Sequence, residues 1–248
     1  MSYPRETQTA MDEYLNNARR VEDGILSMIL KVNPEVVVDI DVGESTQNFI
    51  LDTMKFFIAL DVDYDKLLRF TKEGNLSETK LYKLEFICAD AYYLPLRSDS
   101  IDLVLLHFVL HEINPRFHCR VLTDIKRVSR YILIVEPTSD GTELYRKLWS
   151  IWRDAMRSIG RFEEYRMPEY WLQLLNKLGI CIVKKKIIKW EVTVPYEVLK
   201  TVVSPWVREW RQKNVPEKFV KQLKEFLEEA KVKEFKWSDI FAVLASKT

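Results

Sequence analysis

The sequence predicts an α/β fold in which a mostly parallel, seven-stranded sheet carries helices on both faces. Short apolar runs, each as long as a strand, alternate with longer segments in which apolar residues recur at helical spacing. Such alternation is typical of βαβ units, whose right-handed crossovers place helices on both sides of a parallel sheet. The runs interpreted as strands are residues 36–40, 56–60, 84–88, 101–106, 131–135, 180–194 and 240–245.

Helix-breaking residues delimit the elements around the first strand. An amphipathic helix occupies the first thirty residues and ends before Pro34, because the residue before a proline avoids the helical region. After the first strand, Gly43 makes a turn that leads into an expected helix containing residues 49–54. Ser45 or Thr46 should cap this helix, because a hydroxyl oxygen can accept a hydrogen bond from an N–H of the first turn.

The later chain carries further amphipathic segments before the last strand. The segments interpreted as helices are residues 115–128, 144–159, 168–179, 196–212 and 216–231. Pro205 is expected to kink or divide the helix that contains it. We therefore expect three parts, listed here by their bounds: an N-terminal helical segment (1–34), an α/β core (35–195 and 237–248) and a helical insertion or lid (196–236).

The overall charge argues against nucleic acid as the main partner. The 248 residues include 38 Lys and Arg and 37 Asp and Glu, which gives a formal net charge of +1. A protein that wraps DNA or RNA is usually far more basic. We therefore expect no nucleic-acid partner. The six glycines also make a complete glycine-rich cofactor loop difficult to build.

The cysteines and the N-terminus indicate a cytoplasmic protein. Cys88, Cys119 and Cys181 lie far apart and form no CxxC pair, so neither a disulfide framework nor a cysteine zinc site is expected. The N-terminal segment has no apolar signal core, and the longest apolar runs are only as long as a strand. We therefore expect a reducing compartment and no membrane partner.

Acidic residues follow the ends of the first three predicted strands. Asp39 and Asp41, then Asp61, then Asp90 lie where an open α/β sheet binds its ligand. An acid that ends the second strand can accept hydrogen bonds from both ribose hydroxyls. An acid that ends the third can accept from an adenine amino group, while the N–H of Ala91 faces a ring nitrogen. Each of these acids would therefore have a role if the ligand is a nucleoside.

At these positions the sequence resembles the class I S-adenosylmethionine-dependent methyltransferases of the broad small-molecule type. The family's first strand and loop read apolar-apolar-Asp-x-Gly-x-Gly-x-Gly, and residues 37–45 occupy that place as VVDIDVGES. No single motif is specific, and the ordered set over residues 36–136 carries the resemblance, with weaker support to 179. The further matching segments are Leu60-Asp61-Val62-Asp63, Cys88-Ala89-Asp90-Ala91, Leu94-Pro95-Leu96, residues 100–104, Val109-Leu110-His111-Glu112 and Val135-Glu136-Pro137.

The resemblance implies a Rossmann-like fold and S-adenosylmethionine as cofactor, with S-adenosylhomocysteine as product. Asp39 could instead cap the following helix or hold its loop, a role that this residue often has in the family. Asp61 and Asp90 could each be an ordinary strand-end acid, but their combined spacing favours ligand binding. The residues to which cofactor binding is carried over are Asp39, Asp41, Gly43, Asp61, Val62, Asp90, Ala91 and His107.

The glycine loop departs from the family pattern. Asp41 replaces the first glycine and Ser45 the third, so only Gly43 remains. Glycine normally lets the backbone approach the methionine part of the cofactor without a Cβ. A carboxylate at 41 could crowd out the cofactor or repel its carboxylate. With Asp39 and Glu44, it could instead attract the ammonium and sulfonium cations. We expect binding to be retained, because the ribose and adenine positions are intact.

All three histidines lie in one window after the fourth strand, where this fold carries out methyl transfer. His111 is the candidate general base, because an imidazole titrates near neutral pH. His107 is the candidate for lining the cofactor pocket. A structural role is the alternative for each of them, and for His118. Neither HExxH nor its inverse is present, so no metal is expected.

The predicted reaction is an SN2 methyl transfer to a small-molecule acceptor. The Asn-Pro-Pro-Tyr motif of amino-methylating enzymes is absent, and residues 106–109 read LHFV in its place. The alternative is a catalytically inactive, methyltransferase-like cofactor-binding or regulatory protein, which the altered glycine loop would explain. A nicotinamide dehydrogenase is disfavoured, because no GxGxxG follows the first strand. The aromatic helices after residue 196 could pack plainly, cover an apolar substrate or form a homodimer face.

Overall fold

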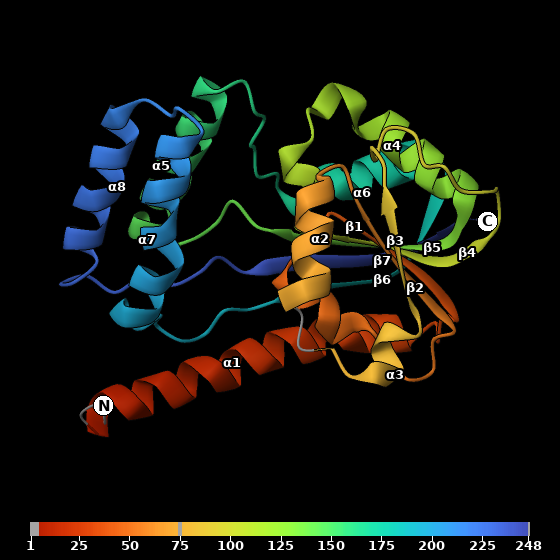
Figure 1. Ribbon diagram of the computed structural model, residues 1–248, viewed down its shortest axis with the longest axis horizontal. Helices are drawn as coiled ribbons and strands as arrows, with labels where there is room; N and C mark the ends of the chain where they lie inside the picture. Colours follow the sequence, from red (N-terminus) through yellow and green to blue (C-terminus); the bar gives the residue numbers. More distant parts are fainter. Residues whose placement is uncertain (1–4, 74–75, 248) are drawn as a thin grey trace. The chain divides into compact units, whose positions relative to one another are not determined.

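A seven-stranded sheet organises the fold. The computed structural model describes residues 5–73 and 76–247, and the order of its strands is β3-β2-β1-β4-β5-β7-β6 (Figure 1). The strands are β1 (Val36–Ile40), β2 (Phe56–Asp61), β3 (Leu84–Cys88), β4 (Ile101–His107), β5 (Ser129–Pro137), β6 (Ile180–Ile188) and β7 (Ile240–Lys247).

The central strands pair in parallel around β1. Val38 of β1 lies opposite Ile58 of β2 and Val104 of β4, and the pairs β2–β3 and β4–β5 are also parallel. The strands β2 and β3 are therefore added on one side of β1, whereas β4 and β5 are added on its other side. Such a reversal of strand order leaves a crevice at the carboxyl ends of β1 and β4, where open α/β sheets bind ligands.

Helices fill the connections between the strands. Among the described residues, none of the helices is long and apolar enough to cross a membrane. The α-helices are α1 (Arg5–Leu30), α2 (Tyr64–Glu73), α3 (Glu78–Leu81), α4 (Pro115–Val128), α5 (Glu143–Ser158), α6 (Pro168–Lys177), α7 (Tyr196–Gln212) and α8 (Glu217–Glu229), and two short 3-10 helices are η1 (Glu44–Phe49) and η2 (Leu110–Glu112).

Helices cover both faces of the sheet, which confirms the predicted fold class. In Figure 1, α4 and α6 lie on one side of the strands and the end of α1 on the other. On the first side, alternate strand residues such as Val38, Val104 and Ile132 pack against Leu122 of α4 and Trp171 of α6, all fully buried. Period-two alternation on a strand and 3.6-residue spacing on a helix bring these apolar faces together.

The chain divides into two compact units, each with its own apolar core. The sheet unit contains residues 22–136, 167–187 and 241–248, and the helical unit contains 1–21, 137–166 and 188–240. In the helical unit α5, α7 and α8 share a core that includes Leu148, Trp210 and Phe226. Plain packing therefore accounts for the buried aromatics of α7 and α8, and the proposed substrate contact and dimer face stay predictions.

The segment after β1 differs from the expected helix. Only the six-residue 3-10 helix η1 forms, and it ends at Phe49, so the prediction of a helix containing residues 49–54 is wrong. The cap is also different, because Gly43 occupies the N-cap position and its N–H donates to Thr46 Oγ1 at 2.9 Å. Elsewhere β6 ends at Ile188, short of the predicted 194, and α7 continues through Pro205 without a break.

The Asp102 carboxylate fixes the start of β1 to β4. Its Oδ2 accepts hydrogen bonds from the N–H groups of Glu35 and Val36, both at 2.9 Å. We expect Asp102→Ala to lower the free energy of unfolding by about 1–2 kcal/mol, because two hydrogen bonds to a charged acceptor are lost at a partly exposed site. Urea unfolding measures the loss. Glu85→Ala on β3, an exposed acid, is the control and should change stability by less than about 0.5 kcal/mol.

Candidate functional site

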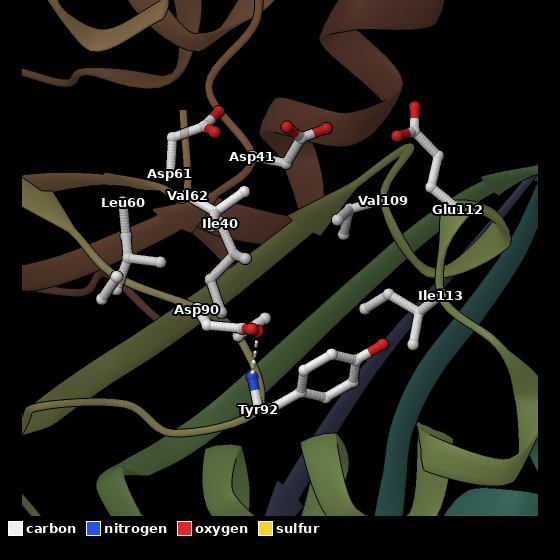
Figure 2. Close-up of a pocket in the computed structure, with 12 residues that line it drawn as sticks. Ile40, Asp41, Leu60, Asp61, Val62, Asp90, Tyr92, Val109, Glu112 and Ile113 are labelled. Carbon is white, nitrogen blue, oxygen red and sulfur yellow. Dashed lines mark hydrogen bonds between the residues drawn. The ribbon is translucent and has the colours of Figure 1, made fainter. Parts of the chain in front are cut away.

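A cavity of about 220 Å³ lies at the carboxyl ends of the central strands. Figure 2 shows the carboxylates of Asp41, Asp61 and Glu112 at one end of it, and Asp90 with Tyr92 at the other. The apolar part of the lining comes from strand ends and from the turn after β4. The lining residues are Ile40, Asp41, Leu60, Asp61, Val62, Ala89, Asp90, Ala91, Tyr92, Val109, Glu112 and Ile113.

The carboxylate of Asp61 connects the loops that follow β1 and β2. Its Oδ2 accepts a hydrogen bond from the N–H of Val42 at 3.1 Å and contacts Lys66 Nζ at 3.1 Å. Its Oδ1 accepts from the N–H of Asp63 at 2.8 Å. Only 3% of the side chain is exposed. Asp61 is therefore an acceptor in a fixed orientation at the edge of the cavity.

Asp41, at the altered glycine position, adopts a left-handed backbone conformation with φ of 69°. Aspartate tolerates this region better than most residues, so the chain keeps the local geometry without a glycine. The N–H of Asp41 donates to the carbonyl of Leu60 at 2.8 Å, and its Oδ1 contacts Lys66 Nζ at 2.5 Å. The pKa of Asp41 is raised to about 6, because burial and the Glu112 carboxylate raise it more than Lys66 lowers it.

Lys66 bridges the two acids from the first turn of α2. Burial lowers the pKa of its ammonium, but Asp41 and Asp61 together raise that pKa above its usual value. The side chain therefore stays charged at neutral pH. Lys66 gave no signal in the sequence, because a lysine on an amphipathic helix is normally exposed to solvent.

Asp39 lies beneath the loop and away from the cavity lining. Its side chain is 2% exposed, and its Oδ2 accepts a hydrogen bond from Thr46 Oγ1 at 2.7 Å. Among the residues that the structure describes, Oδ1 has no hydrogen-bond partner. Burial raises the pKa of Asp39 to about 8, which makes the protonated form dominant at neutral pH. This environment favours the alternative in which Asp39 holds the loop.

Asp90 and its neighbours form the opposite end of the cavity. The Asp90 carboxylate accepts a hydrogen bond from the N–H of Tyr92 at 2.9 Å (Figure 2). The Tyr92 ring packs against the ring of Phe117 on α4, with centroids 5.0 Å apart. An acceptor beside an aromatic side chain and the apolar Ile113 suits a flat, polar-edged ring.

The histidines after β4 have different environments. His107 is not among the residues that line the cavity, and its ring stacks on Phe108 and meets the edge of Phe49. Burial and the nearby His111 lower the pKa of His107 to about 4, so the ring is neutral at pH 7. His118 is buried, with Nε2 within hydrogen-bonding distance of the carbonyls of Leu110 and Ile113, at 3.0 and 2.8 Å. These contacts give His118 a structural role.

His111 forms a buried pair with Glu136 at the end of β5. Its Nδ1 lies 2.7 Å from Glu136 Oε2, and the N–H of Leu110 donates to Glu136 Oε1 at 2.7 Å. A carboxylate in this position favours a proton on Nδ1 and fixes the orientation of the ring. The sequence placed Glu136 at a strand end but gave no sign of this pairing.

The structure brings most of the predicted binding residues into one place. Asp41, Asp61, Val62, Asp90 and Ala91 line the cavity together. The predicted residues outside this lining are Asp39, Gly43, His107 and His111. Sequence reasoning did not assign Lys66, Glu112 or Tyr92 to the site. The only signal for the last two was their place in segments that follow β4 and β3.

The buried acid Asp39 makes stability depend on pH. Its folded pKa of about 8 exceeds its ordinary value of 3.8, so the folded protein keeps a proton that the unfolded chain releases as pH rises between these values. The contribution of Asp39 to the free energy of unfolding is therefore greatest below about pH 4, and it is lost progressively as the pH rises toward 8. We expect Asp39→Asn to gain stability relative to the unsubstituted protein, by an amount that grows by about 2–4 kcal/mol between pH 5 and pH 8.

Thermal and urea unfolding at several pH values test this expectation. Asp65→Asn, on the exposed surface of α2, is the control and should follow the unsubstituted protein at every pH. A constant difference between the Asp39→Asn variant and the unsubstituted protein across the range would contradict a buried, protonated Asp39.

Comparisons with known proteins agree with this geometry. A family model described as a methyltransferase domain matches residues 40–131. Among curated protein sequences, none matches the chain significantly. The solved structures with the same fold share little sequence with this chain, so that their similarity concerns the fold.

Three of these structures illustrate the range. An S-adenosylmethionine-dependent methyltransferase from Methanosarcina mazei is 15% identical, with 85% of this chain and 91% of that chain covered and a TM-score of 0.56. An S-adenosylmethionine-dependent methyltransferase from Mesorhizobium loti is 16% identical, with 91% of this chain and 96% of that chain covered and a TM-score of 0.52. The cyclase SpnF is 14% identical, with coverage of 92% and 80% and a TM-score of 0.62. The family model thus matches one segment of the chain, and the solved structures show that the chain shares the fold of S-adenosylmethionine-dependent methyltransferases.

Proposed function

We propose that the protein transfers a methyl group from S-adenosylmethionine to a small-molecule acceptor by an SN2 reaction. The observation that carries this proposal is the meeting of Asp61 and Asp90 in one cavity at the switch point of the sheet. Two carboxylates on neighbouring strand ends, separated by apolar residues, match the two polar ends of a nucleoside. A metal is not part of the proposal.

The residues of the cavity fit the cofactor that the family implies. Asp61 would accept a hydrogen bond from the ribose, and Asp90 with the N–H of Ala91 would face the adenine edge. Val62 and Tyr92 would contact the base. Asp41 and Glu112 would attract the cationic part of the ligand, since both carboxylates lie at the same end of the cavity (Figure 2). Asp41 therefore does not exclude the cofactor on grounds of charge.

Methyl transfer asks little of the protein beyond alignment. When bound, S-adenosylmethionine supplies a methyl group on a sulfonium centre, which is already an activated leaving group. The chain has to hold the acceptor in line and at short range, which can contribute several kcal/mol to the rate. A general base is needed only where the acceptor must lose a proton. We assign that role to His111, with Glu136 as the residue that orients its ring.

The alternative function is a methyltransferase-like protein that binds the cofactor without catalysis or serves a regulatory role. The ion pairs of Asp41 and Asp61 with Lys66 favour this alternative, because they occupy part of the site.

The absence of the Asn-Pro-Pro-Tyr motif supports a small-molecule acceptor over nucleic acid or a glutamine side chain. Binding and transfer are therefore tested separately.

Cofactor binding is the first test. We expect calorimetric titration to give micromolar dissociation constants for S-adenosylmethionine and S-adenosylhomocysteine. Asp61→Ala and Asp90→Ala should each weaken binding about tenfold or more, because each loses hydrogen bonds between a charged acceptor and the ligand. Asp65→Ala, an exposed acid on α2, is the control and should bind normally. No binding of either ligand up to millimolar concentration would overturn the proposed function.

Methyl transfer is the second test. The protein is incubated with methyl-labelled S-adenosylmethionine and a cell extract separated into small-molecule, nucleic-acid and protein fractions. We expect label in the small-molecule fraction. His111→Asn should reduce the transfer rate about 10²-fold or more while cofactor affinity stays unchanged, because a general base typically contributes 10²–10⁴-fold. Label in another fraction would contradict the acceptor class, and binding without transfer would support the inactive alternative.

A further inference from the structure

We propose that Lys66 is a specificity-determining residue of the nucleoside site. Its ammonium group occupies one of the hydrogen-bond acceptor sites of Asp61, and this limits the number of ribose hydroxyls that Asp61 can bind. The inference rests on the proposed function, since it assumes that the ribose hydroxyls are bound by Asp61. It adds a residue that lies outside the glycine loop and outside the cavity lining.

The geometry gives Lys66 two simultaneous partners. Its Nζ lies 2.5 Å from Asp41 Oδ1 and 3.1 Å from Asp61 Oδ2. About a third of the Lys66 side chain is exposed, whereas Asp61 is almost fully buried. The ammonium therefore reaches inward from α2 to a carboxylate that cannot turn away. A lysine side chain is flexible and can release one of two acceptors while keeping the other.

The hydrogen bonds already made by Asp61 limit its remaining capacity. A carboxylate offers about four acceptor sites on its two oxygens. Three of them are taken by the N–H of Val42, the N–H of Asp63 and the ammonium of Lys66. A ribose with two neighbouring hydroxyls needs two sites, and one is left. The two backbone donors belong to the loops that shape the cavity, so Lys66 is the donor that can withdraw.

Asp41 provides the place to which Lys66 can withdraw. The Asp41–Lys66 contact is the shorter of the two, and it does not involve Asp61. Glu112 lies at the same end of the cavity as Asp41 and adds to the negative potential there (Figure 2). With Lys66 present, Asp61 holds a ribose through one hydroxyl, and it holds the second only when its contact with Lys66 is lost.

Two consequences separate this role from a purely structural one. Lys66→Met keeps the length of the side chain and removes the donor, so Asp61 gains a free acceptor and nucleosides should bind more tightly. The same variant makes the acidic end of the cavity more negative. Cationic S-adenosylmethionine should therefore gain more affinity than S-adenosylhomocysteine, whose sulfur is uncharged.

The test compares Lys66→Met with Lys72→Met, an exposed lysine on the same helix. By calorimetric titration we expect S-adenosylhomocysteine to bind about tenfold more tightly to the Lys66→Met variant and unchanged to the Lys72→Met variant. Ligand-observed NMR with adenosine, 2′-deoxyadenosine and 3′-deoxyadenosine then shows how many ribose hydroxyls contribute to binding. The unsubstituted protein should tolerate the loss of one hydroxyl within about twofold, and Lys66→Met should lose affinity severalfold when either is missing.

A second variant is needed in case Lys66→Met does not fold, and melting curves show which variants are folded. Asp41→Gly/Lys66→Met removes both charges and gives the left-handed position the residue that suits it. With adenosine, which carries no ammonium group, it should show the same tighter binding and the same need for both hydroxyls. Unchanged or weaker binding of adenosine by the folded Lys66 variants, while the unsubstituted protein binds it, would overturn this inference alone. No binding by any of the proteins would overturn the proposed function and this inference with it.

Discussion

The buried carboxylate of Asp61 is the interaction on which the rest of the site depends. It accepts from the backbone of both loops that follow the first two strands, so the cavity has its shape only while this side chain stays in place. The parallel pairing of β1 and β2 brings the two loops to the same edge. Asp41, Glu112 and Lys66 then determine the charge around Asp61, and the proposed ligand has to fit both this shape and this charge.

Sequence patterns predicted the sheet well because its central strands are short apolar runs with sharp ends. They failed after β1, where the apolar residues Phe49 and Met54 suggested a helix. There the Thr46 hydroxyl is engaged by Asp39 and Gly43, and the chain makes only a 3-10 turn before a loop. Side-chain hydrogen bonds to the backbone compete with helix formation in this way, and no hydrophobic pattern reports them.

The acids of the site were predictable because topology alone places strand-end residues together. The contact of Lys66 with Asp41 was not, since it depends on a left-handed backbone at residue 41 and on the first turn of α2. The position of His107 outside the cavity could not be predicted from the sequence either. Its ring packs between Phe49 and Phe108, and Phe108 itself has a positive φ of 61° that no composition or spacing indicates.

The buried acid beneath the loop also gives folding a proton stoichiometry. At neutral pH the unfolded chain carries Asp39 ionised, whereas the folded protein holds it mostly protonated. Formation of this loop therefore takes up close to one proton from the buffer. The measured heat of folding should change with the ionisation enthalpy of the buffer, and comparison of two buffers at the same pH would count that proton directly.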